Sequence, residues 1–166
     1  MSGSMPTYAF TVLIDAPVHS VFEYCRDPRK IYAGDPVMKV ADASRTGEGV
    51  GTKAHLTSRV FLFVEDVTID YVEVTPDQRI VFEAHPTMTL VRLGLKSGIS
   101  VATHRWTWTF ESEDGGTRLN LVVVEQDPPR WQRVMDRLTE KSFNTQVRDR
   151  LARIKAAVEE QATAQR

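Results

Sequence analysis

The segment His104–Phe110 reads HRWTWTF and places two of the chain's three tryptophans two residues apart. Side chains that alternate in this way share a face when the backbone is extended, because successive residues of a strand point to opposite sides. One face then holds His104, Trp106, Trp108 and Phe110. The other face holds Arg105, Thr107, Thr109 and Glu111, which suit water. The segment therefore predicts a strand whose aromatic face is buried, either as filled core or as the wall of a hollow.

The segments on both sides of this strand predict an antiparallel sheet. A hairpin turn around Asp114 joins it to the run LNLVVVE at 119–125. Upstream, β-branched and aromatic runs lie at 8–14, 37–44 and 79–85, and two long strands fit within 51–75. Short hairpin joins link the central strands, and such joins connect antiparallel neighbours. Residues 86–100 are ambiguous, and their glycines suggest a mobile excursion. The sequence thus predicts an α+β domain with about seven strands.

The chain also predicts two short helices after the first strand and one long helix near its end. Asp15 can cap the first short helix, and a second helical turn can run to Tyr32. The long tract covers 129 to about 160, but its apolar residues change phase along the helix. One stripe holds Trp131, Val134, Met135 and Leu138, and a second holds Phe143, Val147, Leu151, Ile154 and Val158. We therefore expect a kink or break between Thr139 and Ser142, or a helix that packs on two different bodies.

The composition predicts a single globular domain. The 166 residues are 42% hydrophobic and 26% charged, with a formal net charge of −1. No run approaches the ~20 apolar residues that a membrane-spanning helix needs. The first four residues, MSGS, resemble a cloning remnant, so we assign 5–161 to the domain and expect 162–166 to be a disordered tail. The lone Cys25 cannot form an internal disulfide, which fits the reducing cytoplasm that we expect as its location.

The polar residues form no recognised catalytic, nucleotide or metal motif. The glycine-rich stretch RTGEGVGTK at 45–53 lacks the spacing of a phosphate-binding loop. None of the four histidines belongs to a closely spaced ligand pair, so we expect no metal and no other cofactor. His104, on the aromatic face, and Glu65, which shares strand parity with Val67, are the weak candidates for acid–base catalysis. A satisfied core histidine and an exposed strand-end carboxylate are the alternatives.

Basic residues gather towards the end of the chain. Residues 129–166 hold nine Lys or Arg and five Asp or Glu. On one continuous helix, Arg130, Arg133, Arg137, Lys141, Arg148 and Lys155 would fall within a sector of about 80°. Such a row could meet an acidic partner or an anionic lipid surface, although charged rows are usually solvated faces. We do not expect nucleic acid to be the partner of this protein.

The order of the predicted elements resembles the START-like, or SRPBCC, superfamily, which includes polyketide cyclase/dehydrase-like proteins. The segments that carry the resemblance are FTVLIDAPVHSVFEYCRDP, GEGVGTK, THRWTWTF, DGGTRLNL and the final helix. The resemblance implies a helix-grip fold, in which a curved antiparallel sheet wraps around the C-terminal helix and an apolar ligand commonly lies between them. This chain departs from many relatives in a stretch where they are rich in tryptophan. It has RKIYAGDPV there, with Tyr32 as the one aromatic residue.

Resemblance and strand parity together give a set of candidate ligand-binding residues. They are Tyr32, Phe63, Val67, Ile69, Tyr71, Phe82, His104, Trp106, Trp108, Met135 and Leu138. The leading hypothesis is a carrier or sensor for a hydrophobic or aromatic small molecule, such as a lipid or a polyketide-like compound. The alternatives are a cyclase-, dehydratase- or aromatase-like enzyme that uses the same pocket, and an interaction module that uses the basic helix. The identity of the ligand and the oligomeric state stay open.

Overall fold

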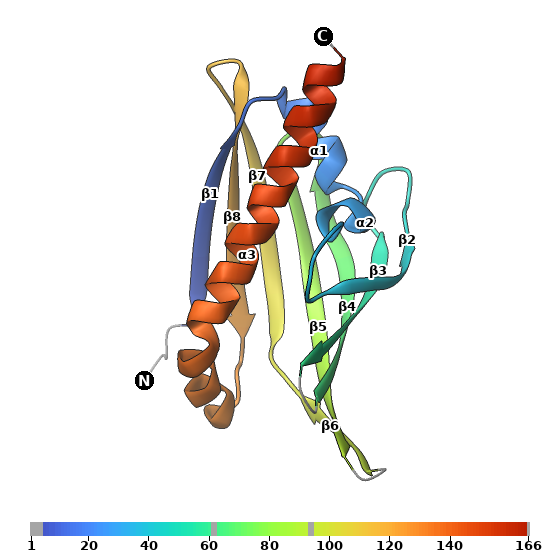
Figure 1. Ribbon diagram of the computed structural model, residues 1–166, viewed down its shortest axis with the longest axis vertical. Coiled ribbons are helices and arrows are strands. Elements are labelled where there is room, and N and C mark those ends of the chain that lie inside the picture. Colours follow the sequence, from blue (N-terminus) through green and yellow to red (C-terminus); the bar gives the residue numbers. More distant parts are fainter. Residues whose placement is uncertain (1–4, 61–62, 93–94, 166) are drawn as a thin grey trace.

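Eleven elements follow one another along the chain in the computed structural model, which describes residues 5–60, 63–92 and 95–165 (Figure 1). The strands are β1 (Thr7–Ile14), β2 (Lys39–Ser44), β3 (Lys53–Val60), β4 (Phe63–Thr75), β5 (Arg79–Arg92), β6 (Leu95–Ser100), β7 (Thr103–Glu113) and β8 (Gly116–Gln126). The helices are α1 (Val18–Cys25), α2 (Pro28–Ile31) and α3 (Arg130–Ala164). Within the described residues, no helix is both long and apolar enough to cross a membrane.

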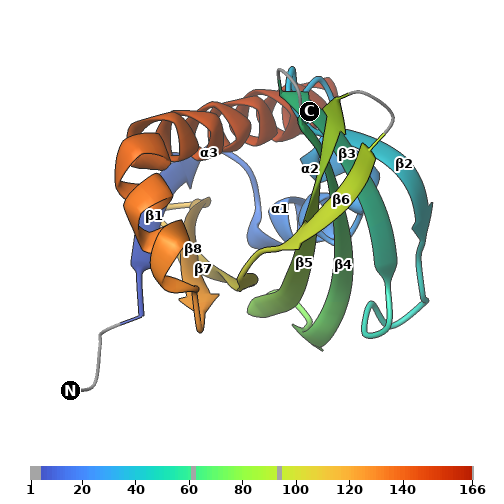
Figure 2. The ribbon, with the colours of Figure 1, turned by 90° about the horizontal axis from the view of Figure 1, so that it is seen from below.

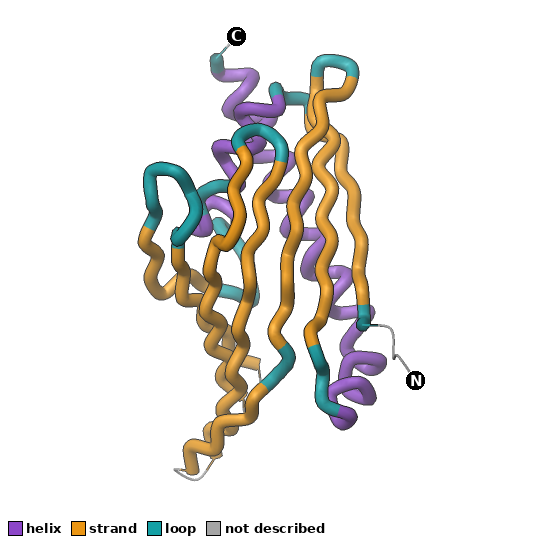
Figure 3. The backbone as a smooth tube through the Cα atoms, turned by 180° about the vertical axis from the view of Figure 1, so that it is seen from behind, coloured by secondary structure: helices purple, strands orange, loops and turns teal. Residues whose placement is uncertain are grey.

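The strands form one curved antiparallel sheet in the order β1-β8-β7-β5-β4-β3-β2. The remaining strand, β6, pairs with the end of β5. Seen from behind, the strands lie in front and α3 lies beyond them, so the helix covers only the concave face (Figure 3). This arrangement confirms the predicted α+β helix-grip fold. Residues 86–100, in which we expected a mobile excursion, instead contribute the second half of β5 and all of β6.

The register of β7 confirms the predicted split between its two faces. Trp106, Trp108 and Phe110 are buried, whereas Thr107 and Thr109 are partly exposed on the opposite face. Trp108 lies between Ile80 of β5 and Leu121 of β8, and its side chain is 1% exposed. Large apolar side chains from β1, β4, β5 and β8 continue this core towards α1 and α3. The concave face therefore holds a filled core over much of its area.

The short helices close one end of the sheet. The second, α2, is capped by Asp27, whose side chain accepts a hydrogen bond from the backbone N–H of Arg29. The first, α1, begins after Pro17, so Pro17 holds the N-cap position that we expected for Asp15. The backbone N–H of Asp15 instead donates to Glu159 of α3 at 2.8 Å. This contact ties the end of β1 to the last helix.

The long helix α3 runs without interruption from Arg130 to Ala164, so there is no break between Thr139 and Ser142. Figure 2 shows that its first turns bend away from the line of the rest, which agrees with the alternative of a kink. Only the second apolar stripe packs on the sheet. Its members Val147, Leu151, Ile154 and Val158 are buried, while Trp131, Val134, Met135 and Leu138 are exposed. The helix also continues to Ala164 within the expected disordered tail, because Ala162 packs against the core.

Candidate functional site

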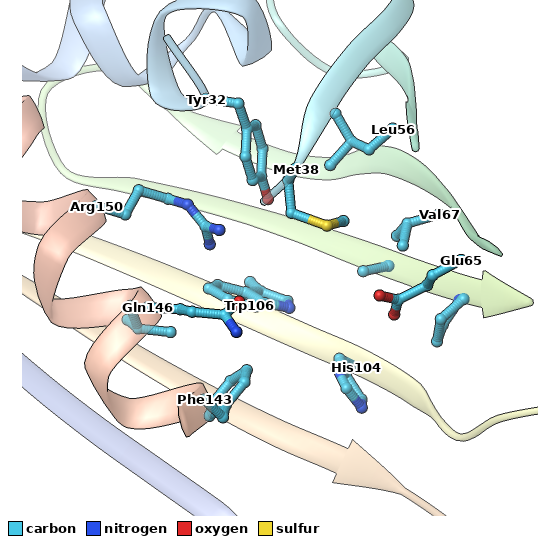
Figure 4. Close-up of a pocket in the computed structure, with 13 residues that line it drawn as sticks. Tyr32, Met38, Leu56, Glu65, Val67, His104, Trp106, Phe143, Gln146 and Arg150 are labelled. Carbon is cyan, nitrogen blue, oxygen red and sulfur yellow. The ribbon is translucent and has the colours of Figure 1, made fainter. Parts of the chain in front are cut away.

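A cavity of about 130 Å³ lies between the concave face of the sheet and the middle of α3 (Figure 4). The pairing of β3, β4 and β5 places apolar side chains along one wall of the cavity. Leu56 of β3 lies opposite Val67 of β4, and Val67 lies opposite Pro86 of β5, so three apolar side chains form a row across the strands. Met38, just before β2, adds a further apolar contact to the lining. The wall is apolar because inward-facing positions on neighbouring strands fall in register.

Trp106 forms the floor of the cavity and links the sheet to α3. Its ring stacks on Phe82 with 5.7 Å between ring centroids, and it meets Phe143 of α3 edge-on at 6.1 Å. The indole nitrogen Nε1 is buried and has no hydrogen-bond partner among the described residues. Buried polar groups are nearly always paired in native proteins. Trp106 therefore brings an unpaired N–H donor to a residue that lines the cavity.

An ion-pair cluster closes one end of the cavity. Arg150 of α3 donates from Nε to Oδ2 of Asp35 at 2.9 Å, and its Nη2 lies 2.8 Å from the same oxygen in an ion pair. Arg153 donates to that oxygen at 3.0 Å. Burial alone would raise the pKa of Asp35, but the backbone N–H of Met38 and the guanidinium of Arg150 outweigh it and lower that pKa. One carboxylate therefore faces two guanidinium groups, which leaves one net positive charge at this end.

The guanidinium of Arg150 also lies against two rings of the cavity. It stands 4.4 Å from the ring centroid of Tyr32 and 6.0 Å from that of Trp106. Its side chain is only 5% exposed, and it belongs to the lining of the cavity. A desolvated cation attracts anions and strong acceptors more than an exposed one does, because water does not screen it. This end of the cavity suits a negatively charged or strongly polar group.

Glu65 of β4 and His104 of β7 lie across the cavity from Arg150 (Figure 4). Burial raises the pKa of Glu65 and lowers the pKa of His104 to about 4. Both shifts favour the uncharged form, because a charge loses its hydration when it is buried. Nε2 of His104 is buried without a hydrogen-bond partner among the described residues, and it lies 3.8 Å from Oε1 of Glu125. The cavity thus contains a carboxyl group and a neutral imidazole.

The cavity brings together only some of the residues that we predicted from the sequence. Four of the eleven candidates line it: Tyr32, Val67, His104 and Trp106. Four more, Ile69, Tyr71, Phe82 and Trp108, are fully packed in the core, where the sheet and the helices leave no space. The hydroxyl of Tyr71 donates to the carbonyl of Cys25 at 3.1 Å, so it is not free to anchor a ligand. Phe63 is half-buried and does not line the cavity, and Met135 and Leu138 are exposed on α3.

Several lining residues were missed by the sequence reasoning, and Arg150 is the most important of them. Gln146, Val147 and Phe143 of α3, together with Met38 and Leu56, were also missed. Arg150 follows Val147 by three residues and precedes Ile154 by four, so it lies at the edge of a buried apolar stripe. A charged residue in that position needs a buried partner. That signal was present in the sequence, but it could not identify Asp35 as the partner.

Comparison with known proteins agrees with this fold. The chain shares the fold of a protein from Rhizobium leguminosarum with a TM-score of 0.66 at 16% identity, over 95% of this chain and 96% of that one. A protein from Arthrobacter aurescens gives a TM-score of 0.67 at 15% identity, over 95% and 91%. DynU16, a protein in the dynemicin biosynthetic locus, gives 0.58 at 19% identity, over 92% of this chain and 47% of that one. At these identities the likeness is one of fold.

A comparison with curated protein sequences gives no match. Among the described residues, no group of three or more His, Cys, Asp or Glu side chains is arranged to hold a metal ion. Residues 5–159 match the family described as polyketide cyclase/dehydrase and lipid transport. This match spans every strand of the sheet and all of α3 except its last five residues. The chain therefore belongs to the polyketide cyclase/dehydrase and lipid transport family.

Proposed function

We propose that this protein binds an apolar small molecule with a hydrogen-bond acceptor in the cavity beneath α3, and that it acts as a carrier or sensor of that molecule. The observation that carries the proposal is the unpaired indole N–H of Trp106, a residue that lines the cavity beside apolar side chains. An unpaired buried donor costs about 1–3 kcal/mol. A ligand oxygen that accepts this hydrogen bond removes that cost. The ligand is thereby held in one orientation as well as bound.

The ion-pair cluster around Arg150 favours a ligand with a negative charge at this end of the cavity. Asp35, Arg150 and Arg153 together carry one net positive charge, and Arg150 faces the cavity. A carboxylate, a phenolate or another oxygen-rich group is attracted to this end, and a cationic group is repelled. Glu65 lies across the cavity from Arg150, and burial raises its pKa.

The volume of the cavity limits how much of a ligand can be buried in it. The 130 Å³ is close to the ~150 Å³ of an apolar protein cavity that admits benzene. It lies below the ~300–1,000 Å³ that sites for drug-sized ligands usually occupy. One aromatic ring or a short chain therefore fits while α3 stays in place. A larger ligand must extend beyond the cavity or move the helix.

Calorimetric titration with three molecules of one shape tests this function. The probes are para-butylbenzoate, para-butylbenzyl alcohol and para-butylbenzylamine. We expect the carboxylate to bind most tightly and the amine most weakly. Trp106→Phe keeps an aromatic ring but removes the N–H, so it should weaken carboxylate binding by about tenfold. Trp131→Phe, at an exposed tryptophan, is the matched control and should change nothing. If none of the probes binds, or if the amine binds as well as the carboxylate, the proposal is wrong.

A second candidate function is acid–base catalysis in the same cavity. Glu65 as a carboxylic acid can donate a proton, and His104 as a neutral imidazole can accept one. Residues whose surroundings move their pKa values towards such forms are typical of catalytic pairs. In a cyclase- or dehydratase-like reaction, His104 would remove a proton from carbon next to a carbonyl, and Glu65 would protonate the departing hydroxyl.

Turnover of a short poly-β-ketone thioester distinguishes this second candidate from simple binding. An enzyme should release the cyclised, dehydrated product, with one water lost per ring formed. Glu65→Gln should slow that reaction by at least about a hundredfold while the substrate still binds. A protein that binds the thioester but does not accelerate its cyclisation over buffer is a carrier or sensor, not a cyclase.

A further inference from the structure

The first three turns of α3 present their polar residues to the protein and their apolar residues to solvent. On the inner side, Gln132 is 4% exposed, and its Oε1 accepts a hydrogen bond from the backbone N–H of Ala102 at 2.9 Å. One turn later, the carboxyl group of Asp136 lies beside that of Glu125 in β8. Polar contacts therefore attach these turns to the sheet. The apolar residues take no part in the attachment.

The outer side of the same turns carries an apolar stripe, formed by Trp131, Val134, Met135 and Leu138. Their side chains are 47%, 62%, 48% and 75% exposed. A surface helix normally turns its apolar residues towards the core. Contiguous exposed apolar residues with a polar rim mark surfaces that meet a partner. The orientation of this stripe therefore indicates a partner outside the domain.

A basic row lies beside the stripe, formed by Arg130, Arg133, Arg137 and Lys141. By the 100° step of an α-helix these residues follow one flank of the stripe. All four are exposed, and none forms an ion pair within the described part of the chain. Intramolecular pairing does not account for these cations. Their charge is available to an anionic partner.

We propose that the first three turns of α3 dock on an anionic lipid membrane. An amphipathic helix with tryptophan and aliphatic residues on one side and arginine or lysine beside them lies in the interface, with its apolar side at the boundary of headgroups and acyl chains. Each cation near an anionic surface adds attraction of its own. The apolar stripe and the basic row supply these two components. The proposal does not depend on which ligand the cavity binds.

The shape of the surface favours a membrane over a second copy of the chain. From Trp131 to Leu138 the stripe is only about 10 Å long, at 1.5 Å per residue. A stable protein interface buries roughly 800 Å² on each partner, which a single convex stripe of this length does not provide. Pairing two copies along the stripe would also bring two basic rows together. A bilayer needs neither a complementary groove nor a matching charge pattern.

The position of the stripe leaves it accessible to a flat surface. Figure 1 shows the first turns of α3 at the lower end of the molecule, beyond the start of β1. Figure 2, seen from that end, shows these turns at the edge of the molecule, bent away from the rest of α3. The same helix continues to Phe143 and Arg150, which line the cavity. A membrane contact at the start of α3 would therefore be made by the same helix that forms part of the cavity wall.

Co-sedimentation with vesicles of two compositions tests the proposal. One set contains phosphatidylcholine alone, and the other contains equal parts of phosphatidylcholine and phosphatidylserine. We expect the wild-type chain to bind the mixed vesicles at least about tenfold more tightly than the neutral ones. The double variant Trp131→Ser, Leu138→Ser should lose at least about tenfold of the binding to mixed vesicles. Leu13→Ser, which removes an exposed apolar side chain from β1, is the matched control and should keep full binding.

Two results would overturn the proposal. The first is binding to mixed vesicles that the stripe variant retains and added salt abolishes, because this is nonspecific attraction by the cations. The second is a concentration-dependent dimer, seen by sedimentation, that the stripe variant abolishes while vesicle binding is absent, because a second copy then covers the stripe. Circular dichroism of the variants confirms that each retains its helix, and since the replaced side chains are exposed we expect no change.

Discussion

Asp35 joins three parts of the protein through one carboxylate. Its Oδ1 accepts from the backbone N–H groups of Val37 and Met38, both at 3.0 Å, and its Oδ2 accepts from Arg150 and Arg153. The loop before β2 is thus shaped by the same residue that holds the cavity end of α3. Because Asp35 and Arg150 lie 115 residues apart, no local pattern in the sequence connects them.

Replacing this carboxylate should strongly destabilise the fold. Asp35→Ala leaves two guanidinium groups without their partner, one of them buried, and we expect the free energy of unfolding to fall by about 3–5 kcal/mol. Asp42→Ala removes an exposed carboxylate of β2 and should change stability by less than about 0.5 kcal/mol. Urea denaturation of both variants measures the difference. Equal stability of the two would contradict the structural role that we give to Asp35.

The two tryptophans of β7 should differ in what they contribute, although they lie on one face. Trp108 is packed on all sides, so Trp108→Ala should cost about 3–5 kcal/mol of stability. Trp106 borders the cavity, so Trp106→Ala removes fewer contacts and should cost less, while it should alter ligand affinity. Thermal denaturation with and without para-butylbenzoate separates the two effects. A larger loss of stability for Trp106→Ala than for Trp108→Ala would contradict this difference in packing.

At the scale of elements, β8 and the start of α3 are joined by a pair of carboxyl groups. The carboxyl groups of Glu125 and Asp136 lie beside each other, and the Glu125 side chain is only 7% exposed. Burial, together with the neighbouring Asp136, raises the pKa of Glu125 from 4.5 to about 7. His104, 3.8 Å away, does not offset this, because burial keeps its imidazole neutral. The folded protein therefore keeps a proton on Glu125 up to about pH 7, whereas the unfolded chain releases this proton near pH 4.5.

This contact makes stability depend on pH in a defined direction. The folded state holds the proton more tightly than the unfolded state, so the stabilisation is complete below about pH 4.5 and is lost as the pH rises through 7. Glu125→Gln cannot titrate, so it should lose less stability than the wild type between these pH values. The free energy of unfolding in urea, measured at both ends of this range, tests the difference. The same pH slope in both proteins would exclude Glu125 as the titrating group.

The close approach of β1 and β8 should be sensitive to a single methyl group. A Cβ at Gly116 would lie 2.6 Å from the carbonyl oxygen of Ile14, and the backbone there cannot move aside easily. Gly116→Ala should therefore destabilise the protein by about 1–3 kcal/mol. Gly47→Ala is the control, because nothing lies within 4 Å of the added atom. Thermal denaturation compares the two, and a neutral Gly116→Ala would show that β1 and β8 are not this close.

For the whole molecule, the sequence predicted what depends on local periodicity. The parity of Trp106 and Glu65 and the long helical tract at the end of the chain follow from patterns of two or 3.6 residues, whereas β6 lies in a segment without a clear pattern. The sequence could not show where the packed core ends and the cavity begins. The strand parity that brings Val67 into the cavity also applies to Ile69 and Tyr71, which are filled core. The two apolar stripes of α3 look alike in the sequence, but only the stripe that contains Val147 and Leu151 packs on the sheet.

The most direct test of the proposed site is the indole N–H of Trp106, followed by nuclear magnetic resonance during titration with para-butylbenzoate. The three tryptophans provide internal controls, since Trp108 is packed in the core and Trp131 is exposed. If the ligand accepts a hydrogen bond in the cavity, the Trp106 indole proton should move downfield and exchange more slowly, while the indole protons of Trp108 and Trp131 change little. An unchanged Trp106 signal when the ligand is saturating, or an equal shift with the amine probe, would contradict the proposed binding site.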